Sequence, residues 1–274
     1  MRFAINYSPQ AAALLQQNEI AVDCFKCPDW PEAVAEAGQH APAYVHFPFR
    51  AGTGDVESLD MAKVLNLLEI SDTPYLNVHL SPRASLFDNM PLDTQRPQDR
   101  EQLLNAIQRD VQAFTALFPD KSIILENVMW APDPPWEIPL PALDPELIHT
   151  VVEDSGQGFL LDLAHAAISA DFLGIDRREY IQRLPLHRLR ELHAVGIIVQ
   201  PDGSQLDHFP MGDRDWELLA WALREIGAGR WPEPWVLAFE YGGVGPGYDV
   251  KSLPEVIRAQ APRMSALIQR IVSN

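Results

Sequence analysis

The sequence predicts an α/β fold, a single (β/α)8 barrel that spans residues 1–274. Short apolar runs alternate with segments of helical periodicity along the whole chain. Strands separated by helix-length segments pair in parallel through right-handed crossovers, and a series of eight such units indicates closure into a barrel. The length of 274 residues is close to the roughly 250 that one such barrel needs.

Each expected strand is a short run rich in aliphatic and aromatic residues. The runs are Phe3–Tyr7, Ile20–Phe25, Tyr44–Phe49, Tyr75–Leu80, Ile123–Val128, Phe159–Ala164, Leu192–Val199 and Trp235–Tyr241. The clearest helix has an apolar stripe from Leu103 to Phe118. Further helices are expected over Leu59–Ile70, Pro145–Asp154, Asp171–Leu184, Asp213–Ile226 and Pro254–Val272, the last kinked at Pro262.

An open doubly wound sheet is the alternative fold. Its Gly-x-Gly-x-x-Gly fingerprint is missing, because the first strand ends in Asn6-Tyr7-Ser8-Pro9. The glycine-rich stretch 242–247 follows the last strand, and it suits either a phosphate or the geometry of a turn.

The composition excludes several classes of protein. A net charge of −17 disfavours binding to nucleic acid or to an anionic membrane. No signal peptide and no apolar run of about 18 residues is present, so we expect a soluble, cytoplasmic protein. Cys24 and Cys27 fit a redox pair or half of a zinc site, but two reduced cysteines at a strand end is the simpler interpretation.

Two connections are long, 81–98 after the fourth strand and 129–143 after the fifth. The second is rich in proline and tryptophan, which favours a stiff wall or lid over a substrate.

Residues that bind metals follow one strand after another. The candidates are His46, His79, Glu126, Asp162, His165, His193, Asp207, His208 and Glu240. Five of the eight histidines belong to this set, at the strand ends where barrel enzymes carry out catalysis. Imidazole with carboxylate suits zinc, manganese or iron, and a carboxylate can bridge two ions. The sequence therefore predicts a metal site in the mouth of the barrel.

At these residues the chain resembles the multinuclear non-haem iron-dependent oxidases, a family within the xylose-isomerase-like barrels. The likeness is strongest over Phe159–Gly196, and Glu126–Val128, Pro210–Trp216 and the strand of Glu240 extend it. The resemblance implies two or three metal ions and favours iron over zinc or manganese. It assigns Glu126, Asp162, His193 and Glu240 to one site.

The resemblance also implies a second site at His46 and His79 bridged by Glu126, and a third at His165 with Asp207 or His208. The family usually shows Asp-x-His after strand seven, whereas this chain has Asp207-His208. Family members of known activity use iron and dioxygen to oxidise cysteine residues in ribosomally made peptides, usually beside a peptide-binding partner protein. The chain is therefore expected to act on a peptide or another small molecule.

Three other functions remain open. A sugar isomerase or epimerase needs one metal ion and leaves His46, His79 and the Asp207-His208 pair without a role. A zinc-dependent endonuclease would have to bind a polyanion despite the negative charge of this chain. A barrel kept only as a binding scaffold would contain no metal.

Overall fold

The computed structural model describes residues 1–88, 90–247 and 251–272, and it divides the chain into two compact units. The first unit comprises Met1–His46, Asp60–Thr73 and Arg190–Asn274, and the second comprises Phe47–Leu59 and Pro74–Leu189. The prediction of one domain over 1–274 therefore stays a prediction. Within the described residues, no helix is both long and apolar enough to cross a membrane.

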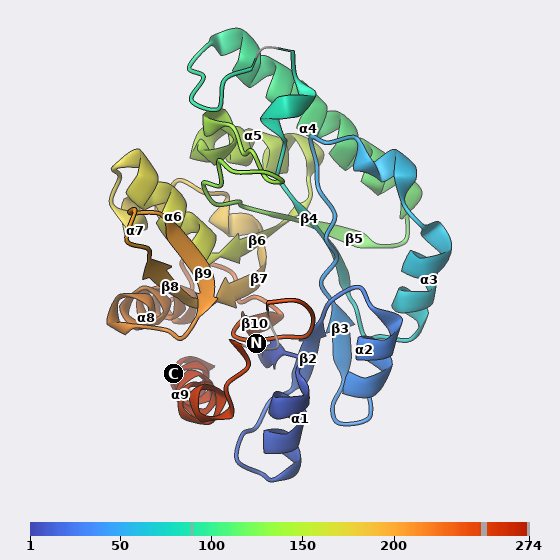
Figure 1. The fold of residues 1–274 in the computed structure, drawn as a ribbon, viewed down its shortest axis with the longest axis vertical. Helices are drawn as coiled ribbons and strands as arrows, with labels where there is room; N and C mark the ends of the chain where they lie inside the picture. The colour runs from blue at the N-terminus through green and yellow to red at the C-terminus, as the bar shows by residue number, and fades with distance from the viewer. Residues whose placement is uncertain (89, 248–250, 273–274) are drawn as a thin grey trace. The chain divides into compact units, whose positions relative to one another are not determined.

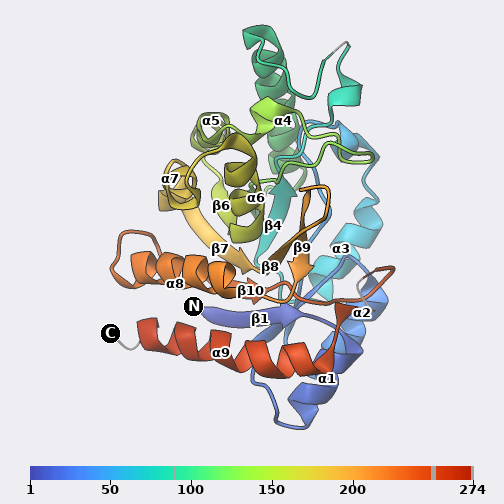
Figure 2. The same cartoon turned by 60° about the vertical axis from the view of Figure 1, so that its left-hand side comes forward.

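The first unit holds five parallel strands in the order β3-β2-β1-β10-β7 (Figure 1). They are β1 (Arg2–Asn6), β2 (Cys24–Cys27), β3 (Ala43–Val45), β7 (Leu189–Ala194, whose first residue lies in the other unit) and β10 (Val236–Phe239). Its helices are α1 (Pro9–Gln16), α2 (Pro31–Ala37), α3 (Met61–Glu69), α8 (Asp213–Gly227) and α9 (Pro254–Val272). Helices α8 and α9 pack side by side, and α9 contacts β1 (Figure 2).

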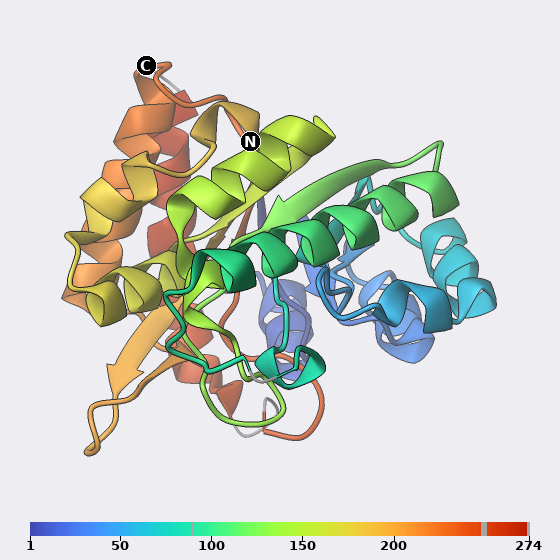
Figure 3. The ribbon, with the colours of Figure 1, turned by 90° about the horizontal axis from the view of Figure 1, so that it is seen from above.

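The second unit holds three parallel strands, with β5 between β4 and β6. They are β4 (Tyr75–His79), β5 (Ser122–Glu126) and β6 (Gly158–Asp162). Its helices are α4 (Pro97–Leu117), α5 (Pro145–Ser155), α6 (Leu163–Leu173) and α7 (Arg177–Gln182), with short 3-10 helices η1 (Asp55–Ser58), η2 (Ala84–Leu86), η3 (Leu140–Leu143) and η4 (Leu186–Arg188). Helices α4 and α5 lie against each other (Figure 3).

All eight predicted runs overlap a parallel strand, but three boundaries were wrong by four residues or more. The third strand ends at Val45 rather than at Phe49. The second strand begins at Cys24 rather than at Ile20. The run Leu192–Val199 is two strands, because β8 (Gly196–Val199) leaves the parallel sheet and pairs antiparallel with β9 (Gln205–Phe209). This pairing requires glycine at position 196, because a Cβ there would come within 2.0 Å of the carbonyl oxygen of Pro210.

The helix predicted over Asp171–Leu184 was also wrong. Helix α6 begins directly after β6 at Leu163, and the αL residue Gly174 ends it before α7 starts. The side chain of Asp162 caps α6, because its Oδ1 accepts a hydrogen bond of 2.7 Å from the amide of His165. His165 therefore lies in the first turn of a helix, although the sequence predicted it at the end of a strand.

The glycine-rich stretch after β10 is explained by a turn. Gly242, Gly243, Gly245 and Gly247 all have positive φ. The amide of Gly243 donates to Ser252 Oγ, so this amide already has a protein partner. The predicted loop 81–98 contains η2, and residue 89 within it lies outside the described residues.

Both cysteines lie in β2, at its first and last positions, and both are buried without forming a disulfide. Burial raises the pKa of each thiol to about 12, so neither forms a thiolate near neutral pH. These properties agree with the structural interpretation of the pair.

Candidate metal centre

The nine predicted ligands divide between the two units. His46, His193, Asp207, His208 and Glu240 belong to the first unit, and His79, Glu126, Asp162 and His165 belong to the second. Each group lies at or just after the carboxyl ends of its parallel strands, apart from Asp207 and His208 on β9. That the two groups converge on one centre stays a prediction.

In the second unit, strand register brings the candidates together. His79 and Glu126 are paired as the last residues of β4 and β5, and their Nε2 and Oε2 atoms are 3.2 Å apart. Glu126 Oε1 lies 3.5 Å from Nδ1 of His165. Glu126, Asp162 and His165 each offer a ligand atom within 4.8 Å of the others. This spacing suits one metal ion with oxygen and nitrogen ligands.

Asn127 holds this cluster in place, although the sequence did not assign it a role. Its side-chain oxygen accepts from the amide of Asp162 at 2.9 Å, and its side-chain nitrogen donates to the carbonyl of Asp162 at 3.0 Å. A buried amide that makes both bonds fixes the end of β6 against the end of β5. The sequence does contain a signal for this role, because Asn127 is a polar residue directly after the glutamate that ends β5.

In the first unit, His193 lies between two glutamates. Its Nε2 is 2.8 Å from Glu191 Oε1, and its Nδ1 is 3.1 Å from Glu240 Oε1. Glu240 shares the face of His193, because Ala238 pairs with His193 and Glu240 follows two residues later. The ring of His46 lies 5.1 Å from the ring of His193.

Glu191 is a buried group that sequence reasoning missed. Its Oε1 accepts from Tyr44 Oη at 2.9 Å, and its Oε2 accepts from the indole of Trp235 at 3.4 Å. His46, Glu191 and His193 also offer ligand atoms within 4.8 Å of one another. Because Glu191 already has protein donors, it is better suited to orient His193 than to bind a metal itself. The sequence could have indicated this role, because Glu191 lies two residues before His193 and therefore on the same face of the strand.

Lys26 is the second group that was missed. Its ammonium forms a buried ion pair with Glu240, although 214 residues separate them in the sequence. Burial alone would raise the pKa of Glu240, but His193 and Lys26 outweigh it and hold this pKa well below its ordinary value. Lys26 follows no recognisable metal-site pattern, so the sequence offered no signal for this contact.

Asp207 and His208 were predicted in a loop, but both lie on β9. Neighbouring strand residues normally point to opposite faces. His208 breaks this alternation with a φ of 60°, and its Nε2 lies 3.8 Å from Asp207 Oδ2. Both side chains therefore face the same region of the first unit.

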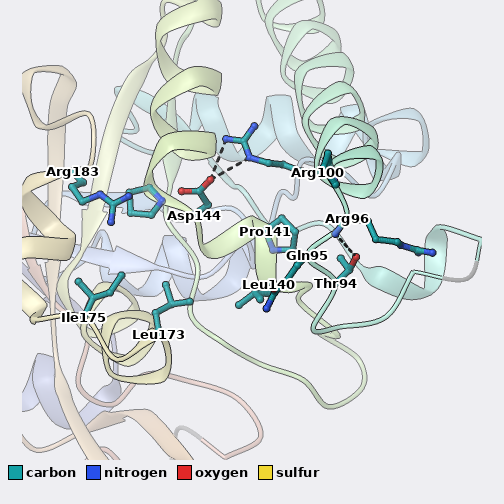
Figure 4. A pocket seen from close by; sticks show the side chains of 12 residues that line it. Thr94, Gln95, Arg96, Arg100, Leu140, Pro141, Asp144, Leu173, Ile175 and Arg183 are labelled. Atoms are coloured by element: carbon teal, nitrogen blue, oxygen red, sulfur yellow. Dashed lines mark hydrogen bonds and ion pairs between the residues drawn. The ribbon is translucent and has the colours of Figure 1, made fainter.

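A separate cavity of 390 Å³ lies in the second unit (Figure 4). Residues 94–97, Arg100, the start of η3, the start of α5, the α6–α7 turn and Arg183 line it, and none of the nine candidates does. Arg100 projects at this cavity and donates to the Asp144 carboxylate at 3.1 Å. The cavity and the metal ligands are therefore different features.

The chain matches one protein-family model. Residues 61–232 match the family described as RiPP precursor modification enzyme MbnB/TglH/ChrH, where RiPP denotes a ribosomally made, modified peptide. Among curated proteins, a UPF0276 protein of Pseudomonas aeruginosa is 28% identical over 177 residues, 62% of this chain and 59% of that protein. A UPF0276 protein of Caulobacter vibrioides is 29% identical over 86 residues, 30% of this chain and 31% of that protein. The matched segment thus spans less than two thirds of each relative.

Two solved structures are similar over nearly their whole length. A xylose isomerase domain containing protein of Salmonella typhimurium has a TM-score of 0.59 at 14% identity, covering 98% of this chain and 97% of that one. The D-psicose 3-epimerase of Clostridium cellulolyticum has a TM-score of 0.56 at 14% identity, covering 99% of both chains. These likenesses confirm the predicted fold class, an α/β barrel.

Proposed function

This chain belongs to the MbnB/TglH/ChrH family of RiPP precursor modification enzymes, and on that premise we propose that it is an iron-dependent oxidase that modifies cysteine in a peptide substrate. The fold and the family indicate an enzyme. The oxidation, the iron and the cysteine are our proposal. We propose further that a peptide-binding partner protein presents the substrate in the cytoplasm.

The observation that carries this proposal is the orientation of three histidines. Nδ1 of His79, His165 and His208 lies 2.9, 2.9 and 2.8 Å from the backbone oxygens of Phe49, Asn127 and Glu240. A carbonyl oxygen only accepts, so each Nδ1 carries a proton, and Nε2 is the nitrogen that remains to bind a metal. This tautomer is the one with which histidine binds metals through Nε2.

The donor set fits iron. Histidine and carboxylate ligands accommodate both ferrous and ferric ions, and none of the nine candidates is a thiolate. We propose that all nine act as ligands, with Glu126 shared between two ions and with two or three ions bound in total. When bound, iron supplies the binding and reduction of dioxygen, which the amino-acid side chains cannot provide.

The protein's own groups prepare the site. Glu191 accepts a hydrogen bond from Nε2 of His193, and this contact turns Nδ1 toward Glu240. Asp162 Oδ1 accepts the capping hydrogen bond of α6, and this bond fixes the orientation of Oδ2. Trp130 stacks on Phe172 with ring centroids 4.0 Å apart and anchors the loop 129–143 in the second unit. We propose that this loop shields the substrate from water.

The test combines metal analysis with turnover. Protein purified without added metal is analysed for elements, and dioxygen uptake is then followed with the cysteine-containing peptide encoded beside its gene. We expect two or more iron ions per chain, uptake that requires this peptide, and a mass change at its cysteine. The substitution His79→Asn should abolish uptake, whereas His149→Asn, which removes an exposed histidine outside the candidate set, should not.

Two results would contradict the proposal. Conversion of a ketose without dioxygen and with a single Mn²⁺ per chain would establish the isomerase alternative instead. Protein that binds no metal under any loading condition would support the scaffold alternative.

A further inference from the structure

Two arginines of the second unit, Arg50 and Arg83, have no carboxylate oxygen within 4.0 Å among the described residues. Six other arginines of this unit, Arg96, Arg100, Arg109, Arg177, Arg183 and Arg188, each have a carboxylate oxygen within 4.0 Å. Arg50 instead donates through Nε and Nη2 to neutral oxygens of Ser81 at 2.8–3.1 Å. Among the described residues, the guanidinium of Arg83 has no hydrogen-bond or ion-pair partner, and its Nε is buried.

The two guanidiniums influence each other. The pKa of Arg50 is lowered first by burial and next by the positive charge of Arg83, while Asp55 opposes the shift with a smaller effect. Both residues are half-buried. Two half-buried cations near enough to feel each other's charge, in a chain with 38 acidic and 21 basic residues, form a local positive centre that an anion would stabilise.

This positive centre lies beside a proposed metal ligand. Arg50 forms a parallel bridge with His79, in which the amide of Ala51 donates to the carbonyl of His79 and the amide of His79 donates to the carbonyl of Phe49. Bridged residues on neighbouring strands point to the same face. Ser81, which accepts from Arg50, follows His79 by two residues.

An aromatic side chain completes the group. The guanidinium of Arg50 lies 5.2 Å from the centroid of the Trp136 ring, and Trp136 is 50% exposed. The loop that carries Trp136 is tied to the segment of Arg83, because the amide of Ala84 donates to the carbonyl of Glu137 at 2.9 Å and Ser85 donates to the Glu137 carboxylate. The carboxylate of Glu137 is thus already engaged.

From this arrangement we infer that Arg50 and Arg83 bind a carboxylate of the substrate beside His79, with Trp136 packing against the adjoining peptide. The planar fork of arginine matches a carboxylate, and the exposed indole offers a flat apolar surface next to it. This inference rests on the proposed function, since it names the substrate feature that the same site would recognise. The carboxylate comes either from the peptide's C-terminus or from an acidic side chain.

Binding of small thiol probes tests the inference without turnover. The probes are N-acetylcysteine, its amide, acetyl-Asp-Cys-amide and acetyl-Cys-Asp-amide, titrated calorimetrically into the metal-loaded protein under nitrogen. At least one carboxylate probe should bind roughly tenfold more tightly than N-acetylcysteine amide. The probe that does so identifies the source of the carboxylate.

The variants assign this preference to the two arginines. Arg50→Gln and Arg83→Gln should each reduce it at least fivefold, and Arg50→Lys should restore only part of it because an ammonium cannot bind in two-pronged fashion. Arg214→Gln removes one exposed arginine of α8 and should leave the preference unchanged. Circular dichroism and metal content confirm that each variant is folded and loaded.

The inference is overturned if no carboxylate probe binds better than the amide, or if the preference survives in both glutamine variants. Failure of the proposed function looks different. In that case the wild-type protein would show the arginine-dependent preference but would consume no dioxygen with any cysteine peptide.

Discussion

The metal-free protein should lose stability as the pH rises above 6.5, because His193 is held as an imidazolium between two carboxylates. Burial alone would lower the pKa of His193, but the charge of Glu240 and the hydrogen bonds to Glu191 and Glu240 outweigh burial and the opposing charge of Lys26. The result is a pKa raised from 6.5 to about 10.

The sign and size of the effect follow from this shift. A folded-state pKa above the unfolded value stabilises the protein fully below pH 6.5, and this contribution is lost as the pH rises toward 10. At about 1.36 kcal/mol for each pKa unit, the loss across that interval is roughly 5 kcal/mol. For a chain of this length, that corresponds to a fall in Tm of roughly 10 °C.

Thermal unfolding in the presence of a chelator measures this loss between pH 6.5 and pH 10. The variant His193→Gln supplies the baseline, since it cannot titrate but experiences every other pH-dependent change. The informative quantity is the fall in Tm of the wild type minus that of the variant. Equal falls in Tm in both proteins would refute the conclusion that His193 is protonated in the metal-free protein. With metal bound, the proton is displaced and the extra fall should vanish.

Three further predictions concern neighbouring groups. The substitution Glu126→Ala should empty more than one metal position and His79→Ala only one, as counted by elemental analysis, and equal losses would remove the bridging role of the glutamate. Lys26→Met removes one of the two cations beside the buried Glu240 carboxylate, so the metal-free protein should lose about 3 kcal/mol in urea unfolding. The same variant should bind Mn²⁺ more tightly in chelator competition, and weaker binding would show that the lysine positions Glu240 for metal. Both buried cysteines should resist a thiol reagent at pH 8 until the protein unfolds, and rapid labelling of the native protein would contradict their high pKa.

The nine candidate ligands could be chosen from the sequence because strand ends are local features. Each of three predicted runs has His79, Glu126 or Asp162 within two residues of its end, and β4, β5 and β6 end at these residues. In a parallel sheet these ends share one edge, and the register of His79 with Glu126 follows. The fold class and the ligand types were therefore predictable from periodicity and spacing.

Local periodicity failed where a single residue changes the path of the chain. The β8–β9 hairpin depends on Gly196, which lies against the backbone of Pro210 fourteen residues later. Helix α6 starts at Leu163, eight residues before the predicted Asp171, because Asp162 caps it. In both places a contact between residues several positions apart decided the structure. The residue types alone are compatible with the predicted elements and with the observed ones.

The sequence by itself determined an α/β barrel of alternating units and a set of imidazole and carboxylate groups at its strand ends. Only the tertiary structure decided how these groups are held. It placed Lys26 against Glu240, Glu191 behind His193, and Arg50 beside His79. The physical reason is that a charge or hydrogen bond acts through space at a few ångströms. The partner of a buried group is therefore set by which strands become neighbours, and residue order along the chain does not record it.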